Sequence, residues 1–350
     1  MSGILRQPQA AQHRARIIVL GLLCALMLSL VLAALCGSVS LSAGTSWEKW
    51  RTVLQQLWIG QGENMDATLL ALRLKRAASA FVIGASLALA GTMMQALLRN
   101  PLADPYVLGV SAGAAVGALG AMLLTSAMLL IDASAFLGAI GVSLLLYGLA
   151  RRDLRTGVVA GSSSLLLTGV MISSGCMALV TLMLSLAPEG RLRGMVFWMI
   201  GDVAGSELRW FPALILVLAW LFAQRMARAM NVLALHAENA VTLGVRVAPL
   251  RQGLFVCAAL LTASAVSSAG SIGFVGLIVP HACRFAFGHD HRLLLPAATL
   301  SGGVFLLLAD TLARTIAAPL QLPVGVVTAL VGVPVFLLQL HQVRRARFAG

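Results

Sequence analysis

Few side chains in this sequence could carry out covalent chemistry or bind a metal. The six histidines include one close pair, His289 and His291, with no third ligand nearby, and a protein zinc site needs at least three ligands. The lysines are Lys49 and Lys75, and neither stands in the Gly-Lys-Ser/Thr pattern that cradles the phosphates of a nucleotide. We therefore expect no catalytic residue, no metal site and no cofactor in this chain.

One carboxylate lies inside an apolar stretch. Nearly all of the 12 acidic residues fall in loops or at the ends of apolar runs, and Asp310 is the exception. Ion-driven transporters usually carry such a carboxylate near mid-membrane, so a secondary transporter driven by an ion gradient through Asp310 is one hypothesis. Arg314 stands four residues later, which is the spacing of an intrahelical ion pair. This structural interpretation of Asp310 is the one we favour.

The composition indicates a membrane protein. Of the 350 residues 59% are apolar and 11% are charged, and the mean hydropathy is +0.94. A soluble domain has about 45–50% apolar and about 25% charged residues, so a soluble fold is excluded. The net charge of +13 could indicate nucleic acid binding, but the basic residues cluster in loops between apolar runs, as the positive-inside rule expects. We expect lipid as the surrounding medium and no nucleic acid partner.

The apolar stretches predict an all-α membrane protein, a bundle of about ten transmembrane helices of about 20 residues each. A signal peptide is the alternative for the first stretch, but its apolar run is too long for one, so we expect a retained anchor. The run 252–283 contains Ser267, Gly270 and Gly273 and is expected to form two helices around a glycine-rich turn. The piece 194–201 is expected to be a short interfacial helix. The uncharged stretches are 17–36, 77–98, 105–131, 133–150, 156–188, 210–224, 252–283, 293–309 and 315–343.

The basic residues predict the orientation. With the N-terminus inside, 16 of the 25 Lys and Arg residues fall on the cytoplasmic side. This excess predicts that both termini are cytoplasmic. The remaining basic residues, Arg73, Lys75, Arg76 and Arg314 among them, then lie on the opposite side and need a separate explanation.

Several long motifs occur in a fixed order along the chain. They are L-R-L-K-R at 72–76, R-N-P-L-A-D-P at 99–105, V-L-G-V-S-A-G-A at 107–114, G-S-I-G-F-V-G-L-I-V-P-H-A-C-R at 270–284, A-D-T-L-A-R at 309–314 and L-P-V-G-V-V-T-A-L-V-G-V-P-V-F at 322–336. From about residue 66 to the end, the sequence resembles the permease subunits of the binding-protein-dependent ABC importers for iron-siderophores, haem and vitamin B12.

The resemblance implies an assembly in the inner membrane. A second copy of the permease, two cytoplasmic ATPase subunits that bind ATP and Mg²⁺, and a periplasmic substrate-binding protein would surround this chain. The cargo would be an iron chelate, haem or a ferric siderophore ahead of cobalamin, moved by alternating access. Residues 1–16 would form a cytoplasmic segment, 17–343 a single permease domain and 344–350 a basic cytoplasmic tail.

The resemblance also assigns candidate site residues at the two membrane surfaces. Arg73, Arg76 and Arg314 match positions that dock acidic residues of the binding protein; snorkelling of each arginine to lipid headgroups is the alternative. Ser162, Ser163 and Ser164 match the cytoplasmic gate, with ordinary helix packing as the alternative.

The stretch 231–245 resembles the coupling helices that fit a cleft of the ATPase, with a plain amphipathic loop as the alternative. We expect coupling to rest mainly on Leu233, Leu235, His236, Glu238, Leu243 and Gly244.

Three positions depart from the family pattern. Lys75 replaces a usual proline, Gln321 a usual glutamate and His236 a usual glycine. Lys75 would add to the basic docking face. The missing carboxylate at Gln321 puts any inherited salt bridge at that end of the last span in doubt.

Overall fold

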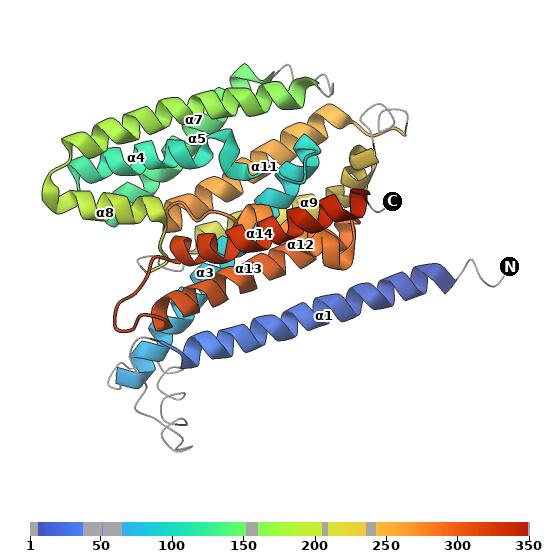
Figure 1. The fold of residues 1–350 in the computed structure, drawn as a ribbon, viewed down its shortest axis with the longest axis horizontal. Helices are drawn as coiled ribbons and strands as arrows, with labels where there is room; N and C mark the ends of the chain where they lie inside the picture. The colour runs from blue at the N-terminus through green and yellow to red at the C-terminus, as the bar shows by residue number, and fades with distance from the viewer. Residues whose placement is uncertain are drawn as a thin grey trace.

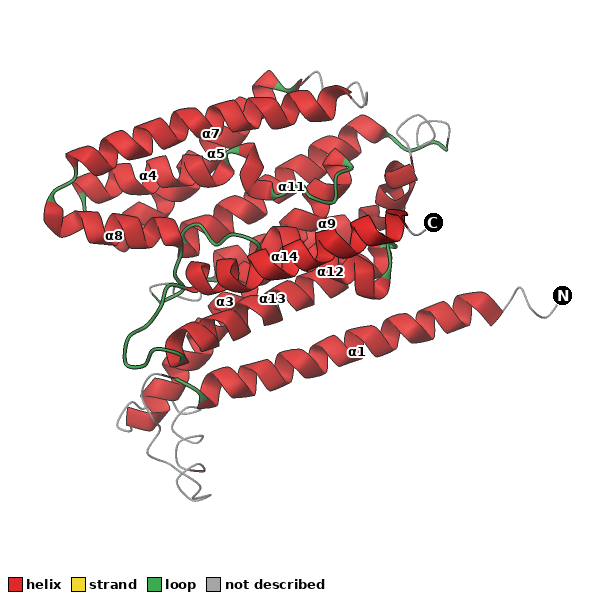
Figure 2. Cartoon of the chain, in the orientation of Figure 1, coloured by secondary structure: helices red, strands yellow, loops and turns green. Residues whose placement is uncertain are grey.

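The structure is a computed structural model that describes residues 6–37, 51, 65–151, 160–204, 209–235 and 243–348. Within these residues the chain is helical and contains no strand (Figure 2). The helices are α1 (Arg6–Leu35), α3 (Met65–Leu98), the 3₁₀ helix η1 (Pro105–Leu108), α4 (Val110–Leu124), α5 (Met128–Leu149), α7 (Ala160–Leu186), α8 (Glu189–Ile200), α9 (Trp210–Leu235), α11 (Val247–Ala269), α12 (Val275–Phe287), α13 (His291–Thr315) and α14 (Val324–Phe348).

The helix lengths agree with a multi-pass membrane protein. Seven of the described helices are long and apolar enough to cross a membrane, and three further apolar stretches, in α4, α12 and α14, are shorter. Helix α1 begins and α14 ends at the same end of the bundle (Figure 1). The expected count of ten spans, and the side of the membrane on which the termini lie, stay predictions.

Helix α3 is the centre of the bundle. Of its most apolar stretch 89% is buried, compared with 11% for α1. Helices α11, α12 and α13 pack directly against α3, whereas α1 lies along the edge beside α13 and α7 lies at the opposite edge (Figure 1). Side chains on α3 are therefore positioned by several neighbouring helices.

Glycines allow α3 and its neighbours to approach at backbone distance. A Cβ atom on Gly84 would lie 2.3 Å from the carbonyl oxygen of Gly302, and one on Gly91 would lie 1.9 Å from that of Gly276. Neither position has room for a larger side chain. Such contacts are expected in a membrane, where lipid provides no hydrophobic drive between helices.

Two glycines with positive φ interrupt the helices. Gly270 (φ +69°) ends α11, and α12 starts at Val275, so the predicted division of 252–283 into two helices is confirmed. Gly109 (φ +80°) separates η1 from α4. Within the uncharged stretch 105–131, helix α4 therefore begins only after this left-handed residue and ends at Leu124, before α5 begins at Met128.

Candidate functional site

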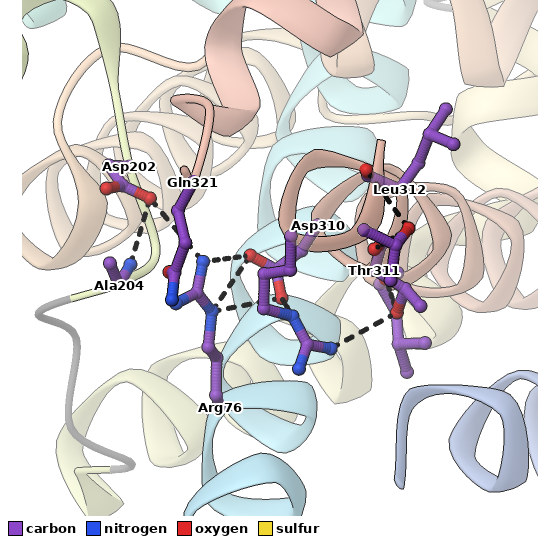
Figure 3. A network of polar contacts seen from close by, with 10 residues as sticks. Arg76, Asp202, Ala204, Asp310, Thr311, Leu312 and Gln321 are labelled. Atoms are coloured by element: carbon purple, nitrogen blue, oxygen red, sulfur yellow. Dashed lines mark hydrogen bonds and ion pairs between the residues drawn. The ribbon is translucent and has the colours of Figure 1, made fainter. Parts of the chain in front are cut away.

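Arg76 and Asp310 form the centre of a polar cluster at one end of the bundle. The Arg76 guanidinium donates from Nε to both carboxylate oxygens of Asp310, at 3.0 and 3.1 Å, and from Nη2 to Oδ1 at 2.7 Å (Figure 3). The side chain of Asp310 is 1% exposed and that of Arg76 is 14% exposed. Helices α3 and α13 are thereby joined by a charge-assisted, bidentate contact, the strongest kind of side-chain hydrogen bonding.

The same guanidinium contacts two further segments. Its Nη1 donates to Gln321 Oε1 at 2.9 Å, on the segment between α13 and α14. Its Nη2 lies 3.7 Å from Asp202 Oδ1, just after α8 (Figure 3), and the backbone N–H of Asp202 donates to the carbonyl of Ala269 at 2.8 Å. Arg76 therefore links α3, α13 and the segments that follow α8 and α13.

Arg314 completes the charge balance around Asp310. Its Nε lies 3.1 Å from Asp310 Oδ2, one helical turn away, and its Nη2 donates to Thr311 Oγ1 at 3.3 Å. The predicted intrahelical ion pair is confirmed. With two guanidinium groups on one fully buried carboxylate, Asp310 serves as their counter-charge, which favours the structural interpretation over an ion-coupling site.

Arg73 lies close by but has a different set of partners. Its Nη1 donates to the carbonyls of Ala34 and Leu35 at 2.9 and 3.0 Å, and the residue is 7% exposed. These are two of the last carbonyls of α1, for which the helix itself provides no N–H donor. Arg73 therefore caps α1 and holds it against α3.

The structure thus brings the three predicted docking arginines to one end of the bundle, although in this chain each has internal partners. Arg73 and Arg314 are buried, Arg76 reaches the surface in part, and Lys75 beside it is exposed. We name Arg73, Arg76, Arg314, Asp310, Asp202 and Gln321 the arginine cluster. Docking by these residues, and snorkelling to headgroups, both stay predictions.

The predicted coupling residues are only partly described. Helix α9 continues as far as Leu235, while His236, Glu238 and the side chain of Leu235 lie outside the described residues. Leu243 is 65% exposed, and Gly244 adopts a positive φ just before α11. These two are placed where a partner could reach them.

Leu233 requires a correction. It is 1% exposed and belongs to the apolar core together with Met230 and Leu250. A side chain enclosed in this way cannot contact an ATPase surface in this structure. Periodicity alone did not indicate which face of this segment would be turned inward.

The predicted gate serines lie in the first turns of α7. The backbone of that helix is described from Ala160 onward, but the side chains of Ser162 and Ser163 lie outside the described residues. Ser164 is exposed. Their proposed gating role stays a prediction.

A second polar cluster lies near the coupling segment and was not anticipated from the sequence. The side-chain amide of Asn231, on α9, donates to Asp290 Oδ1 at 2.7 Å, and its Oδ1 accepts from the backbone N–H of His291 at 2.9 Å. Gln224, two turns earlier on α9, donates to the carbonyl of Arg292 at 3.0 Å. We name Gln224, Asn231, Asp290, His291 and Arg292 the α9–α13 junction.

Asp290 is the N-cap residue of α13, directly before its first residue, His291. Its Oδ1 accepts from the backbone N–H of Arg292 at 3.0 Å, as an N-cap residue does. Partial burial would raise the pKa of this carboxyl. The N–H of Arg292, the amide of Asn231 and the neighbouring positive charges outweigh burial and hold the pKa below its usual value. In the sequence, an aspartate followed by an apolar run indicates an N-cap, but nothing there indicates that the partner of this aspartate lies on α9.

Other contacts at the helix ends were also missed. Arg191, on α8, donates to the carbonyls of Met122 and Leu123 at the end of α4, at 2.8 and 2.6 Å. Arg209, just before α9, lies 2.6 Å from Asp132 on α5. Arg191 and Arg209 are two more of the basic residues that the charge count places on the side opposite the cytoplasm. Both therefore have partners inside the protein.

Comparisons with known proteins give the family. The sequence model of the FecCD transport family matches residues 27–342. The "Cobalamin import system permease protein BtuC" of Halobacterium salinarum is 41% identical over 288 residues, covering 80% of this chain and 75% of that protein. The "Vitamin B12 import system permease protein BtuC" of Escherichia coli is 39% identical over 324 residues, covering 90% of this chain and 94% of that protein.

A solved structure agrees with these sequence relatives. It describes an inward-facing conformation of a metal-chelate type ABC transporter, with a TM-score of 0.80 and 31% identity over 93% of this chain and 99% of that chain. Likeness in sequence and in fold therefore extends over nearly the whole chain. The chain belongs to the FecCD transport family, as a multi-pass permease of an ABC importer.

Proposed function

We propose that this chain is the permease subunit of an importer for cobalamin in the inner membrane. The observation that carries the proposal is the likeness to two permeases named for cobalamin and vitamin B12, at 41% and 39% identity. Their names reverse the order of substrates expected from the motifs, which placed haem or a ferric siderophore first. Cobalamin is itself a metal chelate, so the description of the structural relative is compatible with this substrate.

We propose that the energy for transport comes from partner subunits. The sequence contains no phosphate-binding loop, and Asp310 is enclosed by Arg76 and Arg314 rather than available to a moving ion. Two ATPase subunits that bind ATP and Mg²⁺ would act on the predicted coupling segment 231–245, and a binding protein would deliver the cargo. No covalent step is assigned to this chain.

A second copy of the chain is part of the proposal. Helix α7 is only 17% buried in its most apolar stretch, and it exposes hydroxyl groups at Ser174, Thr181 and Ser185. Each of these hydroxyls donates to a carbonyl four residues earlier. The hydroxyl protons are therefore satisfied within the helix, and the oxygens remain on its exposed face as acceptors. Such a face suits a path between two copies better than contact with lipid tails alone.

Within the arginine cluster, we assign docking of the binding protein to Arg76 together with the exposed Lys75. Arg73 and Arg314 would act indirectly, since the first caps α1 and the second shares the carboxylate of Asp310. This narrows the predicted set of three docking residues to the one that reaches the surface.

The experiment that tests the function is uptake into proteoliposomes. The permease would be assembled with an ATPase and a binding protein, and radiolabelled cobalamin, haem and a ferric siderophore would be compared. ATP-dependent uptake of cobalamin is the expected result. Uptake of haem or siderophore alone would contradict the substrate, and uptake without ATP that an ionophore abolishes would favour the ion-driven alternative.

A further inference from the structure

We propose that Asn231 is a positioning residue for energy coupling, because it makes the end of α9 and the start of α13 move as one unit. The proposal rests on the proposed function, in which ATPase subunits act on the segment that begins at Asn231. The chain itself connects the predicted coupling segment to α11. The contact at Asn231 adds a second route, by which a movement of that segment reaches α13 directly.

The first argument is the geometry at Asn231. Its amide uses both ends, with Nδ2 donating to the Asp290 carboxylate and Oδ1 accepting from the His291 backbone N–H. The same Oδ1 lies 2.7 Å from His291 Nδ1. Because an amide oxygen can only accept, the proton of that bond belongs to Nδ1. One side chain therefore contacts the cap residue and the first residue of α13 at three points.

The second argument is that the contact extends along α9. Gln224 lies seven residues before Asn231, on the same face of the helix, and its Nε2 donates to the carbonyl of Arg292. Two side chains of α9 therefore hold three consecutive residues of the turn that begins α13. Hydrogen bonds of this kind fix one register, whereas contacts between apolar faces tolerate sliding.

The third argument concerns the rest of α13. Beyond the junction, the helix packs against α3 at backbone distance where Gly302 faces Gly84. Near its far end, Asp310 holds Arg76 of the same helix α3. A displacement of the end of α9 would thus be carried by one continuous helix to the arginine cluster. Among the described residues, the α9–α13 junction is the polar contact between these two helices. A displacement of α9 would therefore reach α13 through it.

The first test removes the amide in the complete transporter. Permease carrying Asn231→Ala would be reconstituted with ATPase and binding protein, and cobalamin transported per ATP hydrolysed would be measured. We expect ATP hydrolysis to stay within about twofold of the unmodified complex while the transport ratio falls about fivefold, since mutations along a coupling route change coupling by such factors. An unchanged ratio would overturn the proposal.

A matched control is available on the same helix. Arg225 is adjacent to Gln224 but exposed, so Arg225→Gln changes a polar side chain of α9 outside the junction. This variant is expected to keep the unmodified ratio. An equal fall for Arg225→Gln and Asn231→Ala would show a general effect of altering α9, and it would also overturn the proposal.

The second test does not depend on the stability of the alanine variant. Asn231→Cys and Asp290→Cys would be combined in a background without other cysteines and joined by a short bis-thiosulfonate linker. The reduced double variant lacks the Asn231 amide, so it should show the low transport ratio expected for Asn231→Ala. If the two segments must move as a unit, linking them restores the ratio to within about twofold of the cysteine-free protein that keeps Asn231 and Asp290. Loss of transport on linking, reversed by reduction, would show that they separate during the cycle and would refute the proposal.

The outcomes also separate this inference from the proposed function. If the unmodified complex shows no ATP-dependent cobalamin uptake, the function is wrong whatever the variants do. If it shows uptake and the Asn231 variants behave as the controls do, the function stands and the positioning role is wrong.

Discussion

Arg76 and Asp310 are 234 positions apart in the sequence, yet they form a bidentate ion pair, with Nη2 and Oδ1 2.7 Å apart, at one end of the bundle. The pair joins α3, the most enclosed helix, to α13, whose other end begins at the α9–α13 junction. Removing the buried carboxylate would leave both guanidinium groups without their common counter-charge.

Replacing Asp310 by Ala should therefore be strongly destabilising. Arg76 and Arg314 would lose their common counter-charge, and breaking a buried ion pair costs about 3–5 kcal/mol. The free energy of unfolding, measured by SDS titration in detergent micelles, checks this. Asp202→Ala is the control, because its side chain is 28% exposed and lies 3.7 Å from Arg76, so about 1 kcal/mol or less is expected. Equal losses for the two variants would contradict the interpretation.

The local parts of this arrangement were predictable from the sequence. Asp310 and Arg314 are four residues apart on one helix, so their pairing followed from helical geometry. The glycines after Ala269 likewise indicated where the run 252–283 would be divided. In both cases the pattern and its consequence lie within one or two turns of each other.

The long-range parts were not predictable in the same way. Nothing near Arg76 indicates that its carboxylate partner lies on α13, and nothing near Asn231 points to the turn at Asp290. Leu233 fits an exposed coupling surface by type, but the packing of α9 turns it into the core. These outcomes depend on how the helices are arranged in three dimensions, which no local spacing specifies.

Arg73→Ala should loosen α1 without changing the affinity for the binding protein. Two hydrogen bonds from the guanidinium to the last carbonyls of α1 would be lost, and a hydrogen bond within a protein contributes about 0.5–1.5 kcal/mol net. Hydrogen exchange should become faster in the last turns of α1 and stay unchanged in α13. Weaker binding of the binding protein, with unchanged exchange in α1, would instead support the original docking assignment for this residue.

Gly91→Ala should be poorly tolerated although alanine favours helices. The new Cβ atom would lie 1.9 Å from the carbonyl oxygen of Gly276, which is backbone and cannot rotate away. Overpacking of this kind costs about 1–3 kcal/mol or more, so the yield of folded protein and its thermal midpoint in detergent should fall. Gly141→Ala serves as control, because a Cβ atom there would meet nothing within 4 Å. Similar midpoints for both variants would contradict the close approach of α3 and α12.

The carboxyl of Asp290 should make the junction sensitive to acid. Its pKa in the folded protein is lower than usual, so the stabilisation is fully present above the usual carboxyl pKa of about 4 and is lost as the pH falls through the lower folded value. The difference in stability between the unmodified protein and Asp290→Asn should therefore shrink below about pH 4. Thermal unfolding in detergent at a series of pH values measures it, and a difference that stays constant down to pH 2 would be inconsistent with this role.

Gln321→Glu should weaken the binding protein's association while making the arginine cluster more stable. Arg76 now meets a neutral amide at 2.9 Å, and a carboxylate in that place would add a charge-assisted bond and remove one unit of positive charge from the docking surface. An acidic partner should then bind about three- to tenfold more weakly at low salt, with a smaller dependence on salt, because charges at the rim of an interface mainly steer association.

Surface plasmon resonance at several salt concentrations gives both the affinity and its dependence on salt. Gln321→Met is the control that removes the amide without adding charge. If Gln321→Glu binds the binding protein as tightly as the unmodified permease does at low salt, the added negative charge has no effect, and the electrostatic account of docking at Arg76 would be wrong.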